Sequence, residues 1–250
     1  MIVLINSSKT MRAAPGSAGL QRPALIERAE RLDRVLKGMS AAELKSLMHL
    51  SPKLAESTHA LIDRWTVDPD AQTPAIDAFQ GDIFRGLRAH TLSADDRTYA
   101  NDVLRILSGL YGILRPFDGI APYRLELMYP LAADEFRNLY EFWGAAVAET
   151  LPKDGLIVDA ASDEYARLVR PYVDPGRIVE PQFLTQMSAD IEPTFVVVHA
   201  KVARGAYARW LITSRITDPA RFGEFAGLDW VYDPAMSTLE KPVYIKRLGS

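Results

Sequence analysis

The spacing of hydrophobic and polar positions changes along the chain, and each change marks an expected element. Residues 2–5 are β-branched residues or leucine, which is typical of a buried strand at the start of the chain. From residue 24, apolar residues recur at helical spacing between charged ones. Three serines stand where helix N-caps are expected: Ser40, Ser51 and Ser93. These features predict a mostly helical segment over residues 24–150, ending with a helix over 135–150.

After residue 150 short apolar runs alternate with turn residues, which is the pattern of short strands. Four such runs predict strands at 156–158, 178–180, 194–199 and 243–245. The third run contains Phe195-Val196-Val197-Val198 and is the strongest strand signal in the chain. A helix is expected over 201–216, and residues 12–23 are expected to form a loop. We therefore predict an α/β fold of mixed type: one compact domain over residues 1–250, with a central mixed sheet built from both chain ends and a helical middle.

Composition excludes several kinds of chemistry. The 250 residues include no cysteine, so disulfides, Cys-ligated metal sites and a Cys nucleophile are excluded. The formal net charge is −3, so a polyanion would need a local basic patch on a mildly acidic surface. No apolar run approaches the roughly 18 residues of a membrane span. We expect a cytoplasmic protein with no membrane partner, no metal and no cofactor.

A basic helix is the first candidate for function. Lys201, Arg204, Arg209 and Arg215 lie in the helix expected over 201–216, and no acidic residue stands between the first and the last. At about 100° per residue most of them share one face. Such a face suits an anion such as phosphate, although a merely solvated face is the alternative. Gly205 lies within the basic face and would let a backbone or a ligand come close.

A glycine-rich turn is the second candidate. Gly109-Leu110-Tyr111-Gly112 interrupts an apolar helical pattern, as in a helix–hairpin–helix motif. Backbone N–H groups in such a turn hold DNA phosphates without reading bases. Arg105 and Arg115 flank the turn and would add positive charge. The alternative is a glycine C-cap followed by an ordinary tight turn.

The third candidate is an acidic segment directly after the strand expected at 156–158. Ser162-Asp163-Glu164-Tyr165 stands where α/β folds place ligand-binding groups, at the carboxyl end of a strand. Either carboxylate would be available as a general acid or base. In the alternative interpretation both are ordinary acidic residues in the first turn of a helix.

Collinear sequence blocks along nearly the whole chain resemble the YaaA family of bacterial peroxide-stress proteins. The blocks are Ser8–Thr10, Ser51–Ala55, Phe79–Leu87, Leu107–Pro116, Pro122–Glu126, Leu139–Gly144, Ala161–Tyr165 and Ala203–Gly205. The resemblance implies a single α/β domain with a helix–hairpin–helix-like element and a positively charged cleft that binds DNA. It also implies a cellular role in limiting free iron and oxidative DNA damage under peroxide.

The chain departs from the family pattern at two positions of the expected anion cleft. The family usually has a proline before the lysine of its first block, whereas this chain has Asn6-Ser7-Ser8-Lys9-Thr10. Val202 stands where a second lysine is frequent. Both departures would suit a family member that was recruited to a small substrate.

Two functions follow as hypotheses. The leading one is a DNA-binding protein of the peroxide stress response, with double-stranded or junction DNA as partner. The residues expected to bind DNA or another anion are Ser8, Lys9, Thr10, Arg105, Gly109, Gly112, Arg115, Arg124, Lys201, Arg204 and Arg209. The alternative is an enzyme of a specialised pathway acting on a small anionic or nucleotide-like substrate, with Asp163, Glu164 and Lys9 as catalytic residues. A third hypothesis, iron handling, has no ligand spacing to support it.

Overall fold

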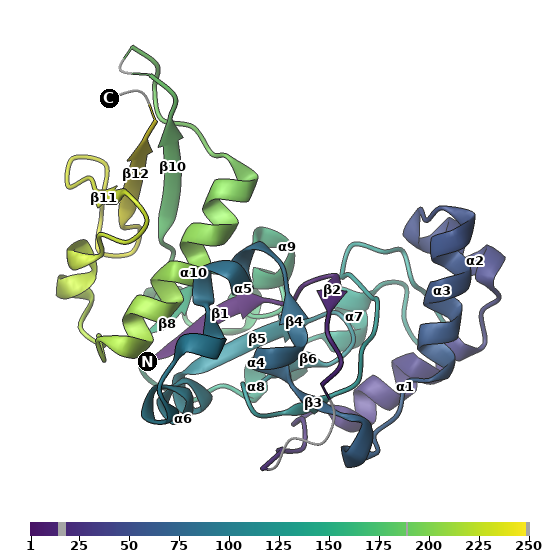
Figure 1. Ribbon diagram of the computed structural model, residues 1–250. Helices are drawn as coiled ribbons and strands as arrows, with labels where there is room; N and C mark the ends of the chain where they lie inside the picture. The colour runs from purple at the N-terminus through teal and green to yellow at the C-terminus, as the bar shows by residue number, and fades with distance from the viewer. Residues whose placement is uncertain (15–18, 189, 249–250) are drawn as a thin grey trace.

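A five-stranded sheet lies at the centre of the computed structural model, which describes residues 1–14, 19–188 and 190–248 (Figure 1). Its strands, in spatial order, are β6 (Gly112–Leu114), β5 (Leu104–Ser108), β1 (Ile2–Asn6), β8 (Ile157–Asp159) and β9 (Ile178–Val179). All neighbours are parallel except β5 and β6. Every residue of β1 is buried, as the apolar run at residues 2–5 predicts for a strand with a neighbour on each side. The mixed α/β fold class is confirmed.

The C-terminal strands form a second, separate sheet. It contains β10 (Gln182–Gln186), β12 (Val243–Arg247) and β11 (Trp230–Tyr232), in that order. The strand expected at 243–245 therefore exists, but the expectation that both chain ends build the central sheet is wrong. The second sheet has an aromatic core of its own, in which Phe183 of β10 stacks on Tyr244 of β12 with ring centroids 5.2 Å apart. Because of this packing, β12 pairs with strands of the second sheet and does not join β1 in the central sheet.

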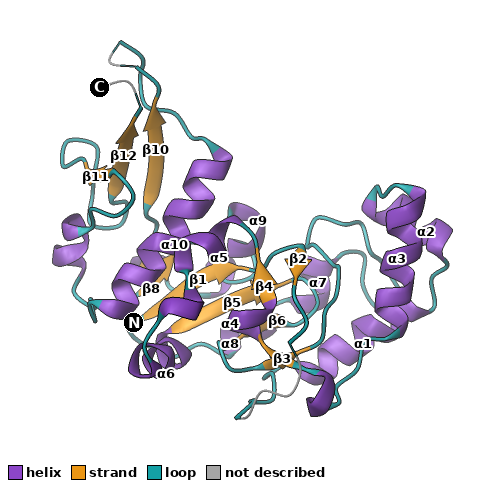
Figure 2. Ribbon diagram, in the orientation of Figure 1, coloured by secondary structure: helices purple, strands orange, loops and turns teal. Residues whose placement is uncertain are grey.

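Two short antiparallel pairs and a set of helices complete the fold (Figure 2). The pairs are β2 (Thr10–Met11) with β4 (Phe79–Gln80), and β3 (Thr73–Pro74) with β7 (Gly119–Ile120). The α-helices are α1 (Ile26–Lys37), α2 (Ala41–Met48), α3 (Pro52–Asp63), α4 (Ala75–Ala78), α5 (Asp82–Leu87), α6 (Ala94–Val103), α7 (Leu139–Trp143), α8 (Ala146–Glu149), α9 (Asp163–Ala166) and α10 (Val197–Thr213). The 3₁₀ helices are η1 (Pro69–Ala71), η2 (Ala89–Thr91), η3 (Arg170–Tyr172), η4 (Pro175–Arg177) and η5 (Pro219–Glu224).

The serine N-caps are where the sequence predicts them. Ser40 caps α2 in a complete capping box with Glu43. Ser51 caps α3 and Ser93 caps α6, each through its hydroxyl. Each serine satisfies a backbone N–H group that has no partner within its helix.

The prediction of a helix–hairpin–helix-like element at residues 104–116 is wrong. Helix α6 ends at Val103, and the next residues form the antiparallel hairpin β5–β6. Gly109 lies in its buried turn and Gly112 begins β6 directly after it, and the indole N–H of Trp143 donates to the Gly109 carbonyl at 3.1 Å. Gly112 has a φ of +71° and leaves no room for a side chain against the Trp143 ring. The turn is therefore a packing feature and exposes no N–H groups to a phosphate.

Two other expected elements differ from the structure. The run at 194–199 is not a strand, because helix α10 begins at Val197 and Val198 is 53% exposed. The helix expected over 135–150 is divided into α7 and α8 by Gly144, which has a φ of +49°. Residues 15–18 of the loop expected over 12–23 lie outside the described residues.

Helices α5 and α10 cross in direct backbone contact. A Cβ atom on Gly205 would lie 1.8 Å from the Ile83 carbonyl oxygen, and one on Gly86 would lie 2.0 Å from the Val202 carbonyl oxygen. Both separations are far below van der Waals contact. Two glycines, one on each helix, allow this crossing. Gly205 was expected to admit a backbone or a ligand, and the backbone of α5 occupies that place.

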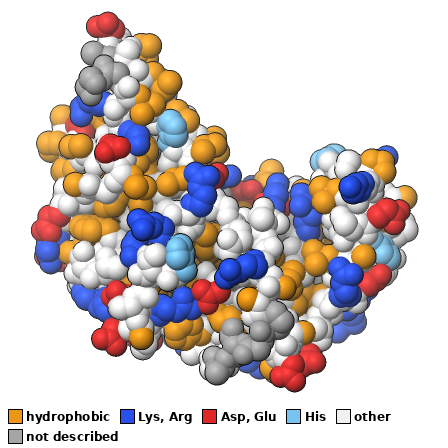
Figure 3. Space-filling view, in the orientation of Figure 1, with side chains coloured by type: hydrophobic (Ala, Val, Ile, Leu, Met, Phe, Trp, Pro, Cys, Tyr) orange, Lys and Arg blue, Asp and Glu red, His pale blue; other side chains and the backbone are white. Residues whose placement is uncertain are grey.

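Two arms extend from the central sheet. One contains β10, β11, β12 and an end of α10, and the other contains α2 and α3 (Figures 1 and 2). The space-filling view shows a broad hollow between the arms, with lysine and arginine side chains around it (Figure 3). Strand β1 ends between the two arms (Figure 1).

Candidate functional site

The carboxyl ends of β1, β5 and β8 meet at one edge of the central sheet, because the three strands are parallel. Ser7 follows β1, Ser108 ends β5, and the segment leading to α9 follows β8. In open α/β sheets this edge is where ligands bind. The segment 122–129 also reaches this edge, as its hydrogen bonds show.

A chain of hydroxyl groups runs through this edge. Ser108 is hydrogen-bonded to the Tyr123 hydroxyl at 2.7 Å. The Ser7 hydroxyl donates to the Tyr165 hydroxyl at 3.5 Å, and Ser7 also lies close enough to Tyr123 to act on the pKa of its phenol. Burial raises the pKa of both phenols above the ordinary range, so both stay protonated.

Glu126 stands at the end of this chain. The Tyr165 hydroxyl lies close enough to the Glu126 carboxylate to lower its pKa, and the Lys9 Nζ lies 3.8 Å from its Oε2. Burial raises the pKa of Glu126, and the nearby Glu164 carboxylate raises it further, while Lys9 opposes both. Only 16% of the Glu126 side chain is exposed, against 51% for Lys9. The pair is thus a mostly buried carboxyl group whose partner amine is open to solvent.

The two acidic residues of α9 have different positions. The Glu164 carboxylate accepts the Met128 backbone N–H at 3.2 Å and lies close enough to Glu126 to affect its pKa. The Asp163 side chain is 90% exposed and pairs with Arg170 at 3.2 Å. Glu164 therefore belongs to the hydroxyl and carboxyl cluster, whereas Asp163 lies outside it.

A second polar cluster surrounds Asp159, the last residue of β8. Its carboxylate is 1% exposed and accepts the Arg170 Nε–H at 2.7 Å. Glu180 lies 3.5 Å from the same guanidinium. Arg204 of α10 lies near enough to this cluster for Asp159 and Asp163 to raise its pKa. Burial, the larger effect, lowers the pKa of Arg204.

Two arginines in this region have buried donors without partners. Among the described residues, the Nε atoms of Arg124 and Arg204 are buried and make no hydrogen bond. Buried polar groups in native proteins are nearly always paired, so an unpaired donor points to a missing acceptor. A carboxylate or phosphate oxygen is the strongest acceptor for a guanidinium.

The remaining predicted residues are distributed more widely. Ser8 accepts the Thr10 N–H at 3.2 Å in the loop after β1, and Thr10 pairs with Gln80 between β2 and β4. Lys201 is half-buried on α10. The Arg209 guanidinium donates to the carbonyls of Leu87, Arg88 and Thr91, at the end of α5 and beyond it. Arg105 and Arg115 line a separate cavity away from the sheet edge.

Sequence reasoning missed the residues at the centre of the cluster. Glu126 and Tyr165 belong to the blocks that resemble the YaaA family, and Ser7 directly precedes the first block, but none of the three was predicted as a site residue. The available signal was the segment Tyr123-Arg124-Leu125-Glu126, in which two charged side chains occur in an irregular, otherwise apolar stretch. Such a stretch needs a partner for each charge.

Comparison with known proteins decides the family. The family model described as "Peroxide stress protein YaaA" matches residues 1–236. The chain belongs to the YaaA family. A UPF0246 protein of Salinispora tropica is 52% identical over 246 residues, covering 98% of this chain and 94% of that protein. A UPF0246 protein of Roseobacter denitrificans is 37% identical over 254 residues, covering 98% of this chain and 98% of that protein. A UPF0246 protein of a Marinomonas strain is 36% identical over 254 residues, covering 98% of this chain and 97% of that protein.

YaaA family membership confirms the resemblance that the sequence blocks indicate, over nearly the full chain. In the described part of this YaaA-family chain, every helix is too short or too polar to cross a membrane. Within the same residues no three histidine, aspartate or glutamate side chains are grouped as a metal site.

Proposed function

We propose that this YaaA-family chain is an enzyme that transfers a proton to or from a small anionic substrate at the carboxyl edge of the central sheet, with Glu126 as the proton carrier. The observation that carries the proposal is the position of the Glu126 carboxyl group. It is mostly buried, close to the Tyr165 hydroxyl, and 3.8 Å from an amine that solvent reaches. A carboxyl group with a raised pKa in such surroundings is suited to general acid–base work.

Lys9, Arg124 and Arg204 would bind the substrate's negative charge. Lys9 offers an exposed ammonium group beside Glu126. Each arginine offers a buried donor that no described residue satisfies. A substrate with a carboxylate or phosphate group would supply these acceptors.

The hydroxyl groups beside Glu126 would help to relay its proton. Tyr165 lies next to the carboxylate and accepts a hydrogen bond from Ser7, and Ser7 in turn lies near Tyr123. Burial is the main cause of the raised pKa of Glu126, and Glu164 adds to it, because two carboxylates close together disfavour double ionisation. The sequence suggested Asp163 or Glu164 as the general acid or base. We assign that role to Glu126 instead, with Glu164 as its neighbour.

A ligand screen tests this proposal. Thermal unfolding of the purified chain would be measured with AMP, malate and 2-oxoglutarate as probes, in the wild type, Lys9→Ala and the control Lys45→Ala. Lys45 is an exposed lysine on α2. At least one probe should raise the unfolding temperature of the wild type and the control but not of Lys9→Ala. Equal stabilisation of all three proteins would contradict the assignment of Lys9.

DNA binding is a second candidate, because lysine and arginine side chains surround the hollow between the arms (Figure 3). The Gly109–Gly112 turn is buried, so phosphate contacts would come from side chains such as Lys9 and Lys201. Fluorescence anisotropy with duplex and four-way-junction DNA at two salt concentrations tests this candidate. Affinity should fall steeply with salt and fall further in Lys201→Ala. An affinity that does not respond to salt would eliminate DNA binding.

A further inference from the structure

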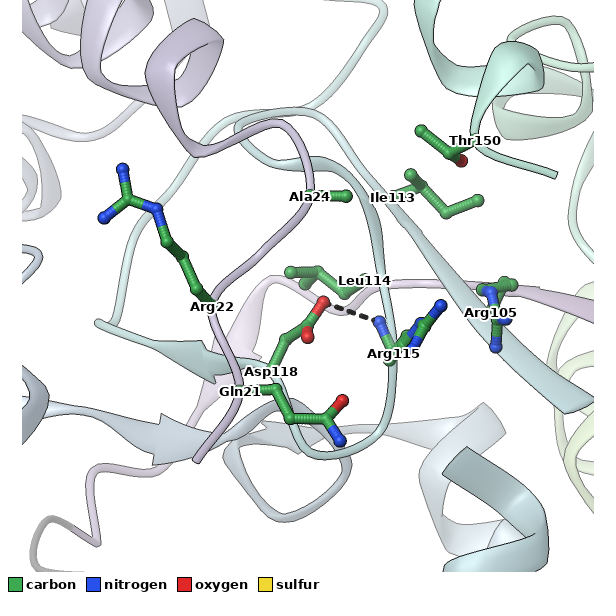
Figure 4. Close-up of a pocket in the computed structure, with 9 residues that line it drawn as sticks. All are labelled: Gln21, Arg22, Ala24, Arg105, Ile113, Leu114, Arg115, Asp118 and Thr150. Atoms are coloured by element: carbon green, nitrogen blue, oxygen red, sulfur yellow. Dashed lines mark hydrogen bonds between the residues drawn. The ribbon is translucent and has the colours of Figure 1, made fainter. Parts of the chain in front are cut away.

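A cavity of about 310 Å³ lies beside β5 and β6, away from the sheet edge described above (Figure 4). Arg105 and Ser108 are both in β5, three residues or about 10 Å apart, and an odd spacing places their side chains on opposite faces of the sheet. The cavity lies on the side of Arg105, whereas Ser108 belongs to the hydroxyl chain. The cavity and the proposed catalytic site are therefore separate.

Two guanidinium groups line this cavity, and in the described chain neither forms an ion pair with a carboxylate. Arg105 is buried, and its guanidinium donates to the carbonyls of Asn101 and Leu104. Arg115 is exposed and is close enough to lower the pKa of Arg105, which burial and this repulsion bring to about 10. In the described chain neither guanidinium has a carboxylate oxygen within 4.0 Å.

The one acidic side chain that lines the cavity is turned to the backbone. Asp118 accepts the backbone N–H of Arg115 at 2.8 Å, as Figure 4 shows. Arg22 also lines the cavity, but its guanidinium points away from Arg105 and Arg115 (Figure 4) and pairs with Glu27 at 2.8 Å. The part of the cavity between Arg105 and Arg115 therefore keeps a net positive charge.

The walls of the cavity are held by backbone hydrogen bonds. Gln21 donates its N–H to the Phe117 carbonyl and accepts the N–H of Gly119, each at 2.8 Å. The Asn101 side chain accepts the Phe117 N–H at 3.0 Å and donates to the Gln21 side chain at 3.3 Å. These bonds tie the segment at Gln21 to the loop that carries Arg115, so the backbone on both sides of the cavity is set in place before any ligand arrives.

We propose that this cavity is a binding site for a small oxyanion of the phosphate or sulfate type, free or as the head group of a monoester, held between Arg105 and Arg115. An oxyanion neutralises the two like charges and uses the forked donors of arginine. The volume accommodates a phosphate group with a small substituent. Arg115 is the exposed member, so the anion enters past its side chain.

Asp118 makes the site sensitive to pH. Burial raises the pKa of Asp118 to about 6, and the charges that act on it are those of Arg115 and Arg105. Arg22 and Asp102 are the other charged groups near this pair. Above this pKa Asp118 carries a negative charge beside the anion, so sulfate, whose own charge is constant over this range, should bind more weakly at pH 7.5 than at pH 5.5.

Isothermal titration with sulfate tests the proposal in the wild type, Arg115→Ala, Lys9→Ala and the control Arg64→Ala. Arg64 is exposed at the end of α3. Sulfate affinity should fall about tenfold or more in Arg115→Ala, as expected for the loss of one charge-assisted contact. It should be unchanged in Lys9→Ala and in Arg64→Ala.

Two further measurements sharpen this test. Asp118→Asn should bind sulfate equally at pH 5.5 and 7.5. Ribose 5-phosphate binding more tightly than inorganic phosphate indicates a monoester ligand, and equal affinity indicates the free anion. The proposal would be overturned if the wild type showed no saturable sulfate binding. It would also be overturned if Lys9→Ala abolished sulfate binding while Arg115→Ala kept it. Because Lys9 and Glu126 play no part here, failure of the proposed catalytic function leaves this site unaffected.

Discussion

Gly205→Ala should destabilise the fold at the crossing of α5 and α10. The added Cβ atom would lie 1.8 Å from the Ile83 carbonyl oxygen and 2.8 Å from the Leu87 backbone N. Both neighbours are backbone atoms of α5, so no side chain can rotate to make room. The two helices would have to separate by about 1 Å or more, which opens the packing along the whole contact.

The magnitude follows from two opposing effects. Overpacking at a rigid site costs about 3 kcal/mol. Replacing a glycine inside a helix by alanine returns about 1 kcal/mol. The free energy of unfolding should therefore fall by about 2 kcal/mol, which for a chain of this size lowers the unfolding temperature by about 4–8 °C.

Urea unfolding followed by circular dichroism measures this difference. Gly38→Ala is the matched control, because Gly38 ends α1 with a φ of −73° and its added Cβ would meet backbone oxygens at ordinary distances of 3.4 and 3.7 Å. The control should be as stable as the wild type or slightly more stable. If Gly205→Ala matched the control, the close backbone crossing would be refuted.

Three other changes have expected outcomes. Tyr111→Phe should lower the unfolding free energy by about 2–3 kcal/mol, measured in urea, because the Tyr111 hydroxyl accepts the buried N–H groups of Trp65 and Ala121; a loss below about 0.5 kcal/mol would contradict this. Ser40→Ala should cost about 1 kcal/mol through loss of the capping box, and unchanged stability would argue against that cap. Asp118 has its pKa raised by burial from 3.8 to about 6, so its ionisation costs stability as pH rises from about 4 to 6. Thermal unfolding of Asp118→Asn should lack that decrease, and a decrease of wild-type size would contradict it.

Local signals in the sequence predicted local structure well. Ser40, Ser51 and Ser93 marked three helix starts because an N-cap acts on the two or three residues that follow it. The apolar run at residues 2–5 predicted a buried strand for a similar reason. The hairpin β5–β6 was missed because Leu104 and Leu107 have helical spacing as well as the composition of a central strand.

The run Phe195–Val198 and the site itself depend on distant contacts. Val197 and Val198 favour a strand, but no strand of the second sheet takes them as a partner, and they become the start of α10. Glu126 meets Lys9 and Tyr165 only because three separate segments reach the same sheet edge. No spacing along the chain encodes that meeting, whereas the family blocks indicated which segments matter.

Glu126→Gln tests the central claim most directly. In a bacterial strain that has this chain as its sole YaaA-family protein, survival under peroxide would be compared between the wild type, Glu126→Gln and the control Glu224→Gln. Glu224 is a surface residue paired with Arg221. Glutamine keeps the shape of the Glu126 side chain but carries no titratable proton, and equal protein levels would be checked by immunoblot. Survival should fall to that of a deletion strain in Glu126→Gln and stay at the wild-type level in the control. Wild-type survival of Glu126→Gln would contradict the assignment of Glu126 as the proton carrier.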